Sequence, residues 1–353
     1  LSPDSEPRAT DAIAGMIELI NGLIEKDLAY AVPDGDVYYR VRRFKDYGKL
    51  SNQNIDELRS GERVEVESKK EDPLDFVLWK RAKPNEPFWE SPWGNGRPGW
   101  HIECSVMSKE TLGNHFDIQG GGMDLKFPHH QCEIAQSEGY HDEPMANYWM
   151  HNGFININNE KMSKSLGNFF TIRDVLKHFP AEVIRFFMLN SHYRTHVNYT
   201  DELLNQSWNG LRRLYTALND APDALPEFNP NHPIALRFTE VMDDDFNTPM
   251  AIDLLFEAAN LYNKNHDPQD YVVLKTLGKV LGILEANPDQ FLKSSPNQSD
   301  DDADFIEALI VQRNEARANK DWAESDRIRD ELKARNVVLE DKQGKTTWRR
   351  ETN

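Results

Sequence analysis

The spacing of apolar residues separates a first part of the chain, which mixes strands and helices, from a second part that is almost wholly helical. Asp11–Ala29 carries apolar residues three and four positions apart, which predicts a helix. Alternation over Val37–Val41 predicts a strand, and the apolar run Phe76–Trp79 predicts a short buried one. Pro84–Gly99 is rich in Pro, Gly and Trp and predicts a loop with little regular structure.

Three glycines interrupt the first part between a predicted strand and a predicted helix. The strand covers Gly113–Ile118, then Gly120, Gly121 and Gly122 follow, and the helix begins near Pro128. Glycines after a strand allow a ligand to lie against the backbone, and a helix N-terminus favours phosphate. A glycine triplet taken alone more often marks an ordinary turn.

The second part predicts a helical bundle. Apolar residues three and four apart recur beyond Thr171. They predict helices over Asp174–His178, Ala181–Leu189, Asp201–Leu218, Pro233–Met242, Pro249–Asn263 and Tyr271–Leu284. Together these segments amount to a domain of about 100 residues, which is a usual domain size.

A linker and a small module end the chain. Ser294–Asp304 has the composition of an exposed linker. We then expect one helix over Phe305–Lys320 and a second that begins after Asp321 and runs to about residue 335. Val337–Leu339 and Thr346–Trp348 predict a hairpin.

Length and composition limit the possible classes of protein. At 353 residues the chain suits two or three domains. Its longest apolar stretches, such as Ala251–Ala259, are interrupted by acidic residues and are too short to cross a membrane. No secretory signal is visible, so we expect a cytoplasmic protein without membrane contacts. The start at Leu1 rather than at Met suggests a missing N-terminal segment.

Cysteine content and charge change this picture only slightly. The two cysteines, Cys104 and Cys132, are too few for a disulfide framework, which suits a reducing compartment. Lys and Arg number 41 and Asp and Glu number 59, so the formal net charge is −18. This charge argues against a general nucleic-acid binder but is compatible with a local basic face.

The most specific motif is Lys161-Met162-Ser163-Lys164-Ser165. Two lysines three positions apart, with hydroxyl groups beside them, suit a loop that neutralises a polyphosphate during nucleotidyl transfer. A generic pair of lysines is more often a solvated turn. This string matches the signature loop of class I aminoacyl-tRNA synthetases letter for letter, and the resemblance implies catalytic roles for Lys161 and Lys164.

The glycines are also part of a longer element. Asp124 lies two residues beyond Gly122, and His129 lies seven residues beyond it. This arrangement resembles the Gly-x-Asp-x-x-x-x-His element of the same class of enzymes. Asp124 is therefore a candidate hydrogen-bond acceptor for the ATP ribose or for the ammonium group of the substrate.

Three residues form a candidate metal site: Cys104, His129 and Glu133. His129 and Glu133 are four positions apart on a predicted helix, which aims both side chains the same way. Thiolate, imidazole and carboxylate are all zinc ligands, although three ligands leave a tetrahedral ion short by at least one. The alternative is a buried cysteine and a core histidine that never meet.

Longer strings narrow the resemblance to cysteinyl-tRNA synthetases of the bacterial type. They are Gly96-Arg-Pro-Gly-Trp-His-Ile-Glu-Cys104, Phe127-Pro-His-His130 with Glu133, Met242-Asp-Asp-Asp-Phe-Asn-Thr-Pro249 and Thr346-Thr-Trp-Arg-Arg350. The likeness covers nearly the whole chain. It implies an α/β fold: the C-terminal half of a split Rossmann-type nucleotide-binding domain with a connecting insertion, then an α-helical bundle and a small C-terminal α+β module.

The resemblance also implies domain limits and an RNA-reading surface. We expect residues 1–95 to be the connecting insertion with part of the catalytic domain, 96–200 the second half of the Rossmann domain, 201–293 a tRNA-binding bundle and 305–353 an anticodon-recognition module. In this module Trp322 would stack on an anticodon base, beside Arg317 and Asp326. The alternative is that Trp322 packs between the two terminal helices.

The implied chemistry is cysteine activation followed by transfer to tRNA(Cys). The family holds one Zn²⁺ per subunit through an N-terminal Cys and three ligands that correspond to Cys104, His129 and Glu133. Zinc would separate L-cysteine from serine because it prefers a thiolate. ATP would enter with Mg²⁺, and Gly120 to Gly122, Met162, Ser163 and Ser165 would line its site. We expect a monomer.

Some residues depart from the family pattern or allow two interpretations. The first zinc ligand and the His-x-Gly-His ATP motif are both absent, which a missing N-terminal segment would explain. Cys132 either competes for zinc or faces away, and Gln119 stands where relatives often have His. Trp100 is either a wall of the amino-acid pocket or a scaffold residue.

Two other functions deserve a test. A cysteine:glucosaminyl-inositol ligase would share the adenylate chemistry and the zinc site, but it would not need the module after Asp304. A non-catalytic tRNA-binding fragment would explain the absent ATP motif.

Overall fold

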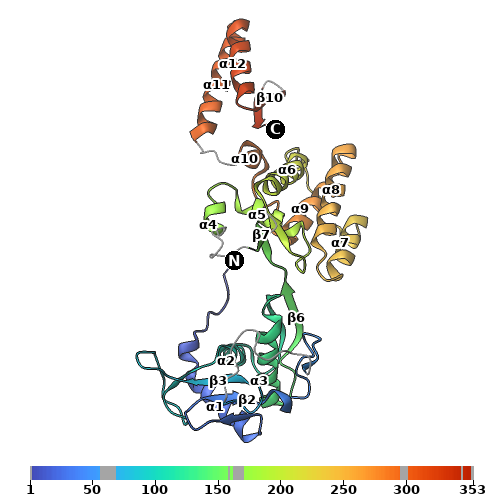
Figure 1. Ribbon diagram of the computed structural model, residues 1–353. Helices are drawn as coiled ribbons and strands as arrows, with labels where there is room; N and C mark the ends of the chain where they lie inside the picture. Colours follow the sequence, from blue (N-terminus) through green and yellow to red (C-terminus); the bar gives the residue numbers. More distant parts are fainter. Residues whose placement is uncertain are drawn as a thin grey trace. The chain divides into compact units, whose positions relative to one another are not determined.

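Figure 1 shows the computed structural model of the chain, which describes residues 2–55, 69–157, 160–161, 171–294, 301–342 and 345–350. These residues fall into two compact units, Leu1–Gly153 and Phe154–Asn353. Among the described helices, none combines the length and apolar character that a membrane crossing would need.

The first unit contains an antiparallel sheet and three helices around one core. The sheet runs in chain order through β1 (Ala29–Ala31), β2 (Val37–Tyr39), β3 (Phe76–Arg81) and β4 (Gly96–Pro98). The helices are α1 (Ile13–Glu25), α2 (Trp100–Leu112) and α3 (Gln131–His141). All of these elements except β4 contribute buried apolar residues to one core cluster. β4 lies inside the segment that was expected to have little regular structure. It forms a strand there because it pairs with β3.

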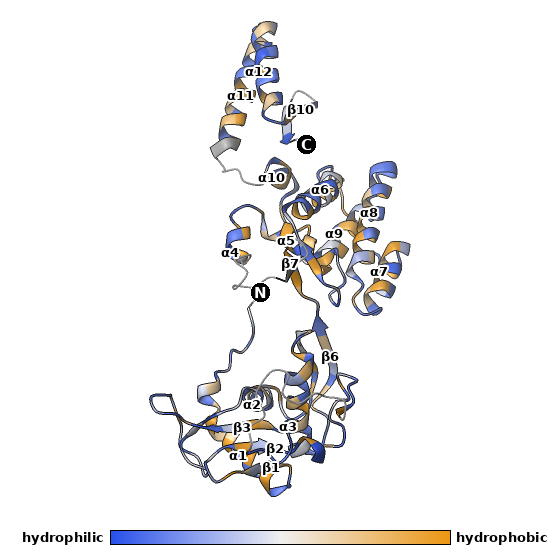
Figure 2. Ribbon diagram, in the orientation of Figure 1, coloured by the Kyte–Doolittle hydropathy of each residue, from blue (hydrophilic) through white to orange (hydrophobic). Residues whose placement is uncertain are grey.

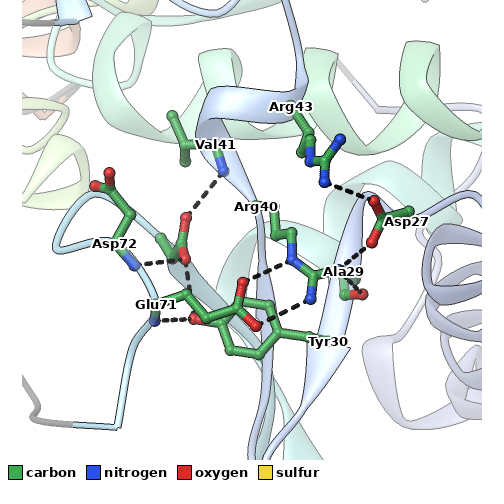
Figure 3. A network of polar contacts seen from close by, with 9 residues as sticks. Asp27, Ala29, Tyr30, Arg40, Val41, Arg43, Glu71 and Asp72 are labelled. Atoms are coloured by element: carbon green, nitrogen blue, oxygen red, sulfur yellow. Dashed lines mark hydrogen bonds and ion pairs between the residues drawn. The ribbon is translucent and has the colours of Figure 1, made fainter.

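A network of polar contacts joins this sheet to the segment before β3 (Figure 3). Asp75 accepts hydrogen bonds from the Tyr30 hydroxyl at 2.9 Å and from the Val41 amide at 3.0 Å. Beside it, Arg40 forms an ion pair with Glu71 at 2.8 Å. Burial raises the pKa of Asp75 even though these donors act against the shift. The contacts hold the start of β3 against β1 and β2.

A parallel pair of strands follows in the same unit. β5 (Phe116–Gly122) pairs with β6 (Ala146–Asn152), and the helical turn η4 (Lys126–His130) and α3 lie between them in the chain. Parallel strands need a crossover connection, which these helices supply. The three glycines therefore belong to the end of β5, whereas the sequence placed them after the strand.

The second unit opens with a small sheet. β7 (Ile155–Ile157) lies between β8 (Glu160–Lys161), to which it is antiparallel, and β9 (Val197–Tyr199), to which it is parallel. Between β8 and β9 the chain forms α4 (Ile172–Val175) and α5 (Ala181–Leu189).

The predicted helices of the bundle are present. They are α6 (Asp201–Leu218), α7 (Pro233–Asp243), α8 (Thr248–Asn265) and α9 (Pro268–Val280). α10 (Pro288–Lys293) follows them and was not predicted. The side chains of Thr200, Asn247 and Asp267 accept hydrogen bonds from backbone N–H groups and thereby cap α6, α8 and α9. α5 to α10 share one core with residues of β9.

The C-terminal module also has the predicted elements. α11 (Asp301–Ala318) begins inside the segment expected to be a linker, and α12 (Trp322–Ala334) is capped by the Asp321 side chain. β10 (Val337–Lys342) and β11 (Lys345–Arg350) form the expected antiparallel hairpin. Figure 2 shows α12 as mainly hydrophilic, and the buried residues of this module form a small separate core.

Candidate functional site

The first unit brings together the three side chains predicted to hold a metal. α2 carries Cys104, η4 carries His129, and Glu133 lies in the first turn of α3. The sulfur of Cys104, a ring nitrogen of His129 and a carboxylate oxygen of Glu133 all lie within 4.8 Å of one another. The alternative, in which the cysteine and histidine never meet, does not describe this arrangement.

Glu133 is the most deeply buried member of this cluster, with no exposed side-chain surface. Its Oε2 accepts a hydrogen bond from Gln119 at 3.0 Å. Its Oε1 lies 2.7 Å from Nε2 of His129, yet it has no hydrogen-bond partner among the described residues. Burying a carboxylate oxygen without such a partner is costly unless a cation compensates for it.

His129 is held by two aromatic neighbours. Its Nδ1 lies 2.7 Å from Nδ1 of His101, and the ring of Trp100 stacks on it with centroids 4.3 Å apart. Burial, and secondarily the neighbouring His129, lowers the pKa of His101 to about 4, so this ring is neutral at pH 7. These contacts occupy one face and one nitrogen of His129 and leave Nε2 directed at Glu133.

The two cysteines have different surroundings. Burial, followed by the carboxylates of Glu133 and Glu103, raises the pKa of Cys104 to about 12, so without a cation the thiol is protonated at neutral pH. Binding of a metal would require and stabilise the thiolate. Cys132 is buried against the core, with its Sγ 3.3 Å from the Tyr47 hydroxyl, and it is not part of the cluster.

The glycines of β5 have a packing role. A Cβ at Gly121 would lie 2.9 Å from the His130 ring, and a Cβ at Gly122 would lie 2.6 Å from Oδ1 of Asp124. By contrast, Gly120 meets only a backbone oxygen at 3.8 Å, which is an ordinary contact. Asp124 itself is exposed beyond the strand. The absence of side chains at Gly121 and Gly122 thus permits close approach within the protein.

The lysine motif is only partly within the described residues. Lys161 is the last residue of β8 and pairs through its backbone with Asn156 of β7. Met162, Ser163, Lys164 and Ser165 lie outside the described residues.

In the C-terminal module, the three predicted RNA-reading residues occupy the surface. Arg317 forms an ion pair with Asp341 at 2.8 Å, and Asp326 forms one with Arg329 at 3.3 Å. Trp322 is 61% exposed and does not belong to the buried core of the module. The structure therefore gives no support to the alternative in which Trp322 packs between the helices.

Sequence reasoning did not single out two contacts of the first unit. His101 lies three residues before Cys104, which puts both side chains on one face of α2. This spacing was the signal in the sequence that could have identified His101. The pair of His130 and His151, 2.9 Å apart, joins residues from η4 and β6 and had no local signal.

Comparison with known protein families gives three matches along the chain. Residues 1–209 match the model described as the tRNA synthetases class I (C) catalytic domain. Residues 237–286 match the DALR domain, and residues 301–349 match the cysteinyl-tRNA ligase anticodon binding domain.

Comparison with individual proteins gives similar results. The chain is 60% identical to a cysteine–tRNA ligase of Chromobacterium violaceum over 353 residues, which are 99% of this chain and 77% of that relative. It is 58% identical to the corresponding ligase of Laribacter hongkongensis, covering 99% of this chain and 76% of that relative. For the ligase of Methylococcus capsulatus the identity is 56%, with 99% and 77% covered.

Proposed function

The chain belongs to the cysteinyl-tRNA synthetase family of class I, and on that premise we propose that Cys104, His129 and Glu133 hold the zinc ion that selects its amino acid. Its function is cysteine–tRNA ligation, with ATP, cysteine and tRNA as substrates. The two alternative functions, a glucosaminyl-inositol ligase and a non-catalytic RNA binder, are not favoured by these matches.

One observation carries the zinc proposal: a carboxylate oxygen of the buried Glu133, a ring nitrogen of the buried His129 and the sulfur of Cys104 converge within 4.8 Å of one another. The donor set of sulfur, imidazole nitrogen and carboxylate oxygen suits zinc rather than magnesium or calcium. When bound, zinc would supply a soft coordination position that accepts the sulfur of cysteine far better than the hydroxyl of serine.

Neighbouring side chains would prepare this site for its substrate. Gln119 donates to one oxygen of Glu133 and so leaves the other for the metal. His101 engages Nδ1 of His129, which sets the orientation of that ring. Trp100 is 59% exposed over His129 and would act as a wall of the amino-acid pocket that excludes water.

For the first reaction we propose that a carboxylate oxygen of cysteine attacks the α-phosphorus of ATP. A bond from that oxygen to phosphorus forms while the bond to pyrophosphate breaks, giving cysteinyl-adenylate. Lys164, with Lys161, would neutralise the β- and γ-phosphates, and Mg²⁺ would accompany ATP. Met162, Ser163, Ser165 and the β5 glycines would line the nucleotide site.

The same proposal includes finer details of fold and RNA binding. β5, α3 and β6 would belong to the second half of a split Rossmann-type domain, with residues 1–95 mainly its insertion. Asp124 would accept a hydrogen bond from the ATP ribose or the substrate ammonium group. In a monomer, the bundle would hold tRNA and the C-terminal module would present Trp322, with Arg317 and Asp326, to an anticodon base.

Isotope exchange between ATP and pyrophosphate tests this function directly. We expect exchange that depends on cysteine, falls by orders of magnitude when serine replaces cysteine, and is lost when zinc is chelated. Exchange that proceeds equally with serine, or that survives complete zinc removal, would contradict the proposed role of the metal.

A further inference from the structure

The segment Met242–Pro249 is one of the strings that resemble the family, but it has no role in the proposed reaction. It forms the turn between α7 and α8. Two successive residues of this turn, Asp245 and Phe246, have φ angles of 54° and 57°. Residues other than glycine seldom adopt this left-handed conformation, and they persist in it only where surrounding contacts enforce it.

Those contacts come from three consecutive residues before β9. Arg194 reaches both carboxylate oxygens of Asp245, with Nε at 2.6 Å and Nη2 at 3.2 Å. The hydroxyl of Tyr193 donates to the same carboxylate at 2.7 Å, and Nε2 of His192 lies 2.9 Å from the main-chain oxygen of Asp245. We call these four residues, His192, Tyr193, Arg194 and Asp245, the Asp245 clamp.

The clamp continues directly into the small sheet of the second unit. Thr195 closes a turn by donating to the main-chain oxygen of His192. His196 then stacks on Phe154 with an interplanar angle of 4° and accepts a hydrogen bond from its amide at 2.9 Å. The amide of Val197 donates to the Phe154 oxygen at 2.8 Å. The residues after the clamp thus hold the start of β7.

β7 connects this contact to the lysine motif. It pairs with β9 on one side and with β8 on the other, and Asn156 of β7 lies opposite Lys161. Lys161 is the first residue of the motif and the last of β8. A continuous series of contacts therefore joins the turn between two helices of the bundle to the strand from which the lysine motif emerges.

Stability alone does not account for this arrangement. The side chains of Arg194 and Asp245 are 54% and 41% exposed, and ion pairs this exposed contribute little to folding. A second pair offers a matched comparison. Arg237 and Glu257 are 54% and 42% exposed and lie 2.9 Å apart, but they join only α7 to α8.

We propose that the Asp245 clamp is a positioning element, which couples the helices of the bundle to the strand that carries Lys161. Asp245 and Arg194 touch no substrate in this scheme. They hold the β9–β7–β8 sheet in the orientation that the bundle dictates and thereby set the position of Lys161. This inference rests on the proposed function, because it requires Lys161 and Lys164 to act on ATP.

The test compares Asp245→Asn and Arg194→Met with the matched control Glu257→Gln in cysteine-dependent ATP–pyrophosphate exchange. We expect each clamp variant to lower kcat about tenfold, while the KM for cysteine and the zinc content stay unchanged. The double variant should lose no more than either single variant, because both changes break one unit. Glu257→Gln should match the unaltered protein in kcat, in the KM for cysteine and in zinc content.

A second measurement, limited proteolysis, tests the role of the clamp without measuring catalytic turnover. Trypsin should cut after Lys161 several-fold faster in Asp245→Asn than in the unaltered protein, and Glu257→Gln should show no such change.

The outcomes separate the clamp from the proposed function. The positioning role of the clamp would be overturned if Asp245→Asn and Glu257→Gln had equal effects on exchange and on proteolysis. Additive losses of kcat in the double variant would also overturn it. Absence of zinc and of cysteine-dependent exchange in the unaltered protein would instead overturn the proposed function, and with it the inference that depends on it.

Discussion

The polar residues of the metal cluster and those of the C-terminal module differ most in their access to water. Glu133 and His129 are 0% and 4% exposed, and their donor atoms converge on one another. In the C-terminal module Trp322 is 61% exposed, and Arg317 and Asp326 form ion pairs with their own neighbours.

This difference in burial determines how strongly the protein alone defines each binding site. A buried carboxylate has lost its hydration, so the donor atoms that converge on it mark a place suited to a cation. Exposed groups are hydrated or paired with one another until a partner arrives, and their geometry gives no such mark. Buried polar clusters can therefore be assigned from the protein alone, whereas surface recognition sites need their partner.

The largest effect is expected from a substitution that breaks the buried cluster. Replacing His129 with Ala removes a ligand and leaves Glu133 without its neighbour, so we expect cysteine-dependent exchange to fall by more than about 100-fold. Steady-state exchange assays with metal analysis check this. His141→Asn, at the C-terminal end of the helix that carries Glu133, is the control and should retain zinc. Equal zinc contents in the two variants would contradict the assignment.

A smaller effect is expected one contact further out. Gln119→Ala removes the hydrogen bond to Glu133, and outer contacts of this kind change metal affinity by about 10- to 100-fold. Competition with a zinc chelator measures the affinity. Gln119→His keeps a donor and should restore most of it. If the alanine and histidine variants bind zinc equally well, the contact does not orient Glu133.

The exposed module should respond differently, because we propose that its residues act only on RNA. Trp322→Ala should raise the KM for tRNA about tenfold, through the loss of one stacked base, without changing ATP–pyrophosphate exchange. Phe305→Ala is the control, since Phe305 is another exposed aromatic residue of the module, at 43%. Equal changes in KM for tRNA in both variants would argue for a general rather than a specific role of the surface.

The smallest expected effect concerns the ion pairs of that module. Arg313, followed by Thr346, lowers the pKa of Asp341 to about 2 in the folded protein. The carboxylate therefore contributes stability above its usual pKa of about 4, and this contribution disappears as the pH falls towards 2. Because Asp341 is 41% exposed, we expect Asp341→Asn to cost only about 0.5 kcal/mol at pH 7. Thermal unfolding at pH 7 and pH 3 should show the variant's deficit shrinking at the lower pH.

Much of the fold could be predicted from local pattern. α6, α8 and α9 have apolar residues at helical spacing and side chains that cap their N-termini, so each can be found without its neighbours. The short α10 (Pro288–Lys293) was not predicted. β4 escaped prediction because its three residues, Gly96–Pro98, form a strand only by pairing with β3. The glycines of β5 escaped for the same reason, since their strand partners lie in β6.

The candidate site divides in a similar way. Cys104, His129 and Glu133 could be found because their types and spacing fit a metal and the resemblance aligned them. Their convergence could not be derived, because it depends on how α2 packs against α3. Cys132 was ambiguous in sequence, and only the fold directs its sulfur to Tyr47 instead of the cluster.

Zinc content of two single-cysteine variants tests the central claim most directly. Cys104→Ala and Cys132→Ala each remove one of the two thiols, but only the first removes a predicted ligand. Measured by mass spectrometry after dialysis against trace chelator, Cys104→Ala should retain almost no zinc, and Cys132→Ala should retain as much as the unaltered protein. Loss of zinc from Cys132→Ala with retention in Cys104→Ala would contradict the account.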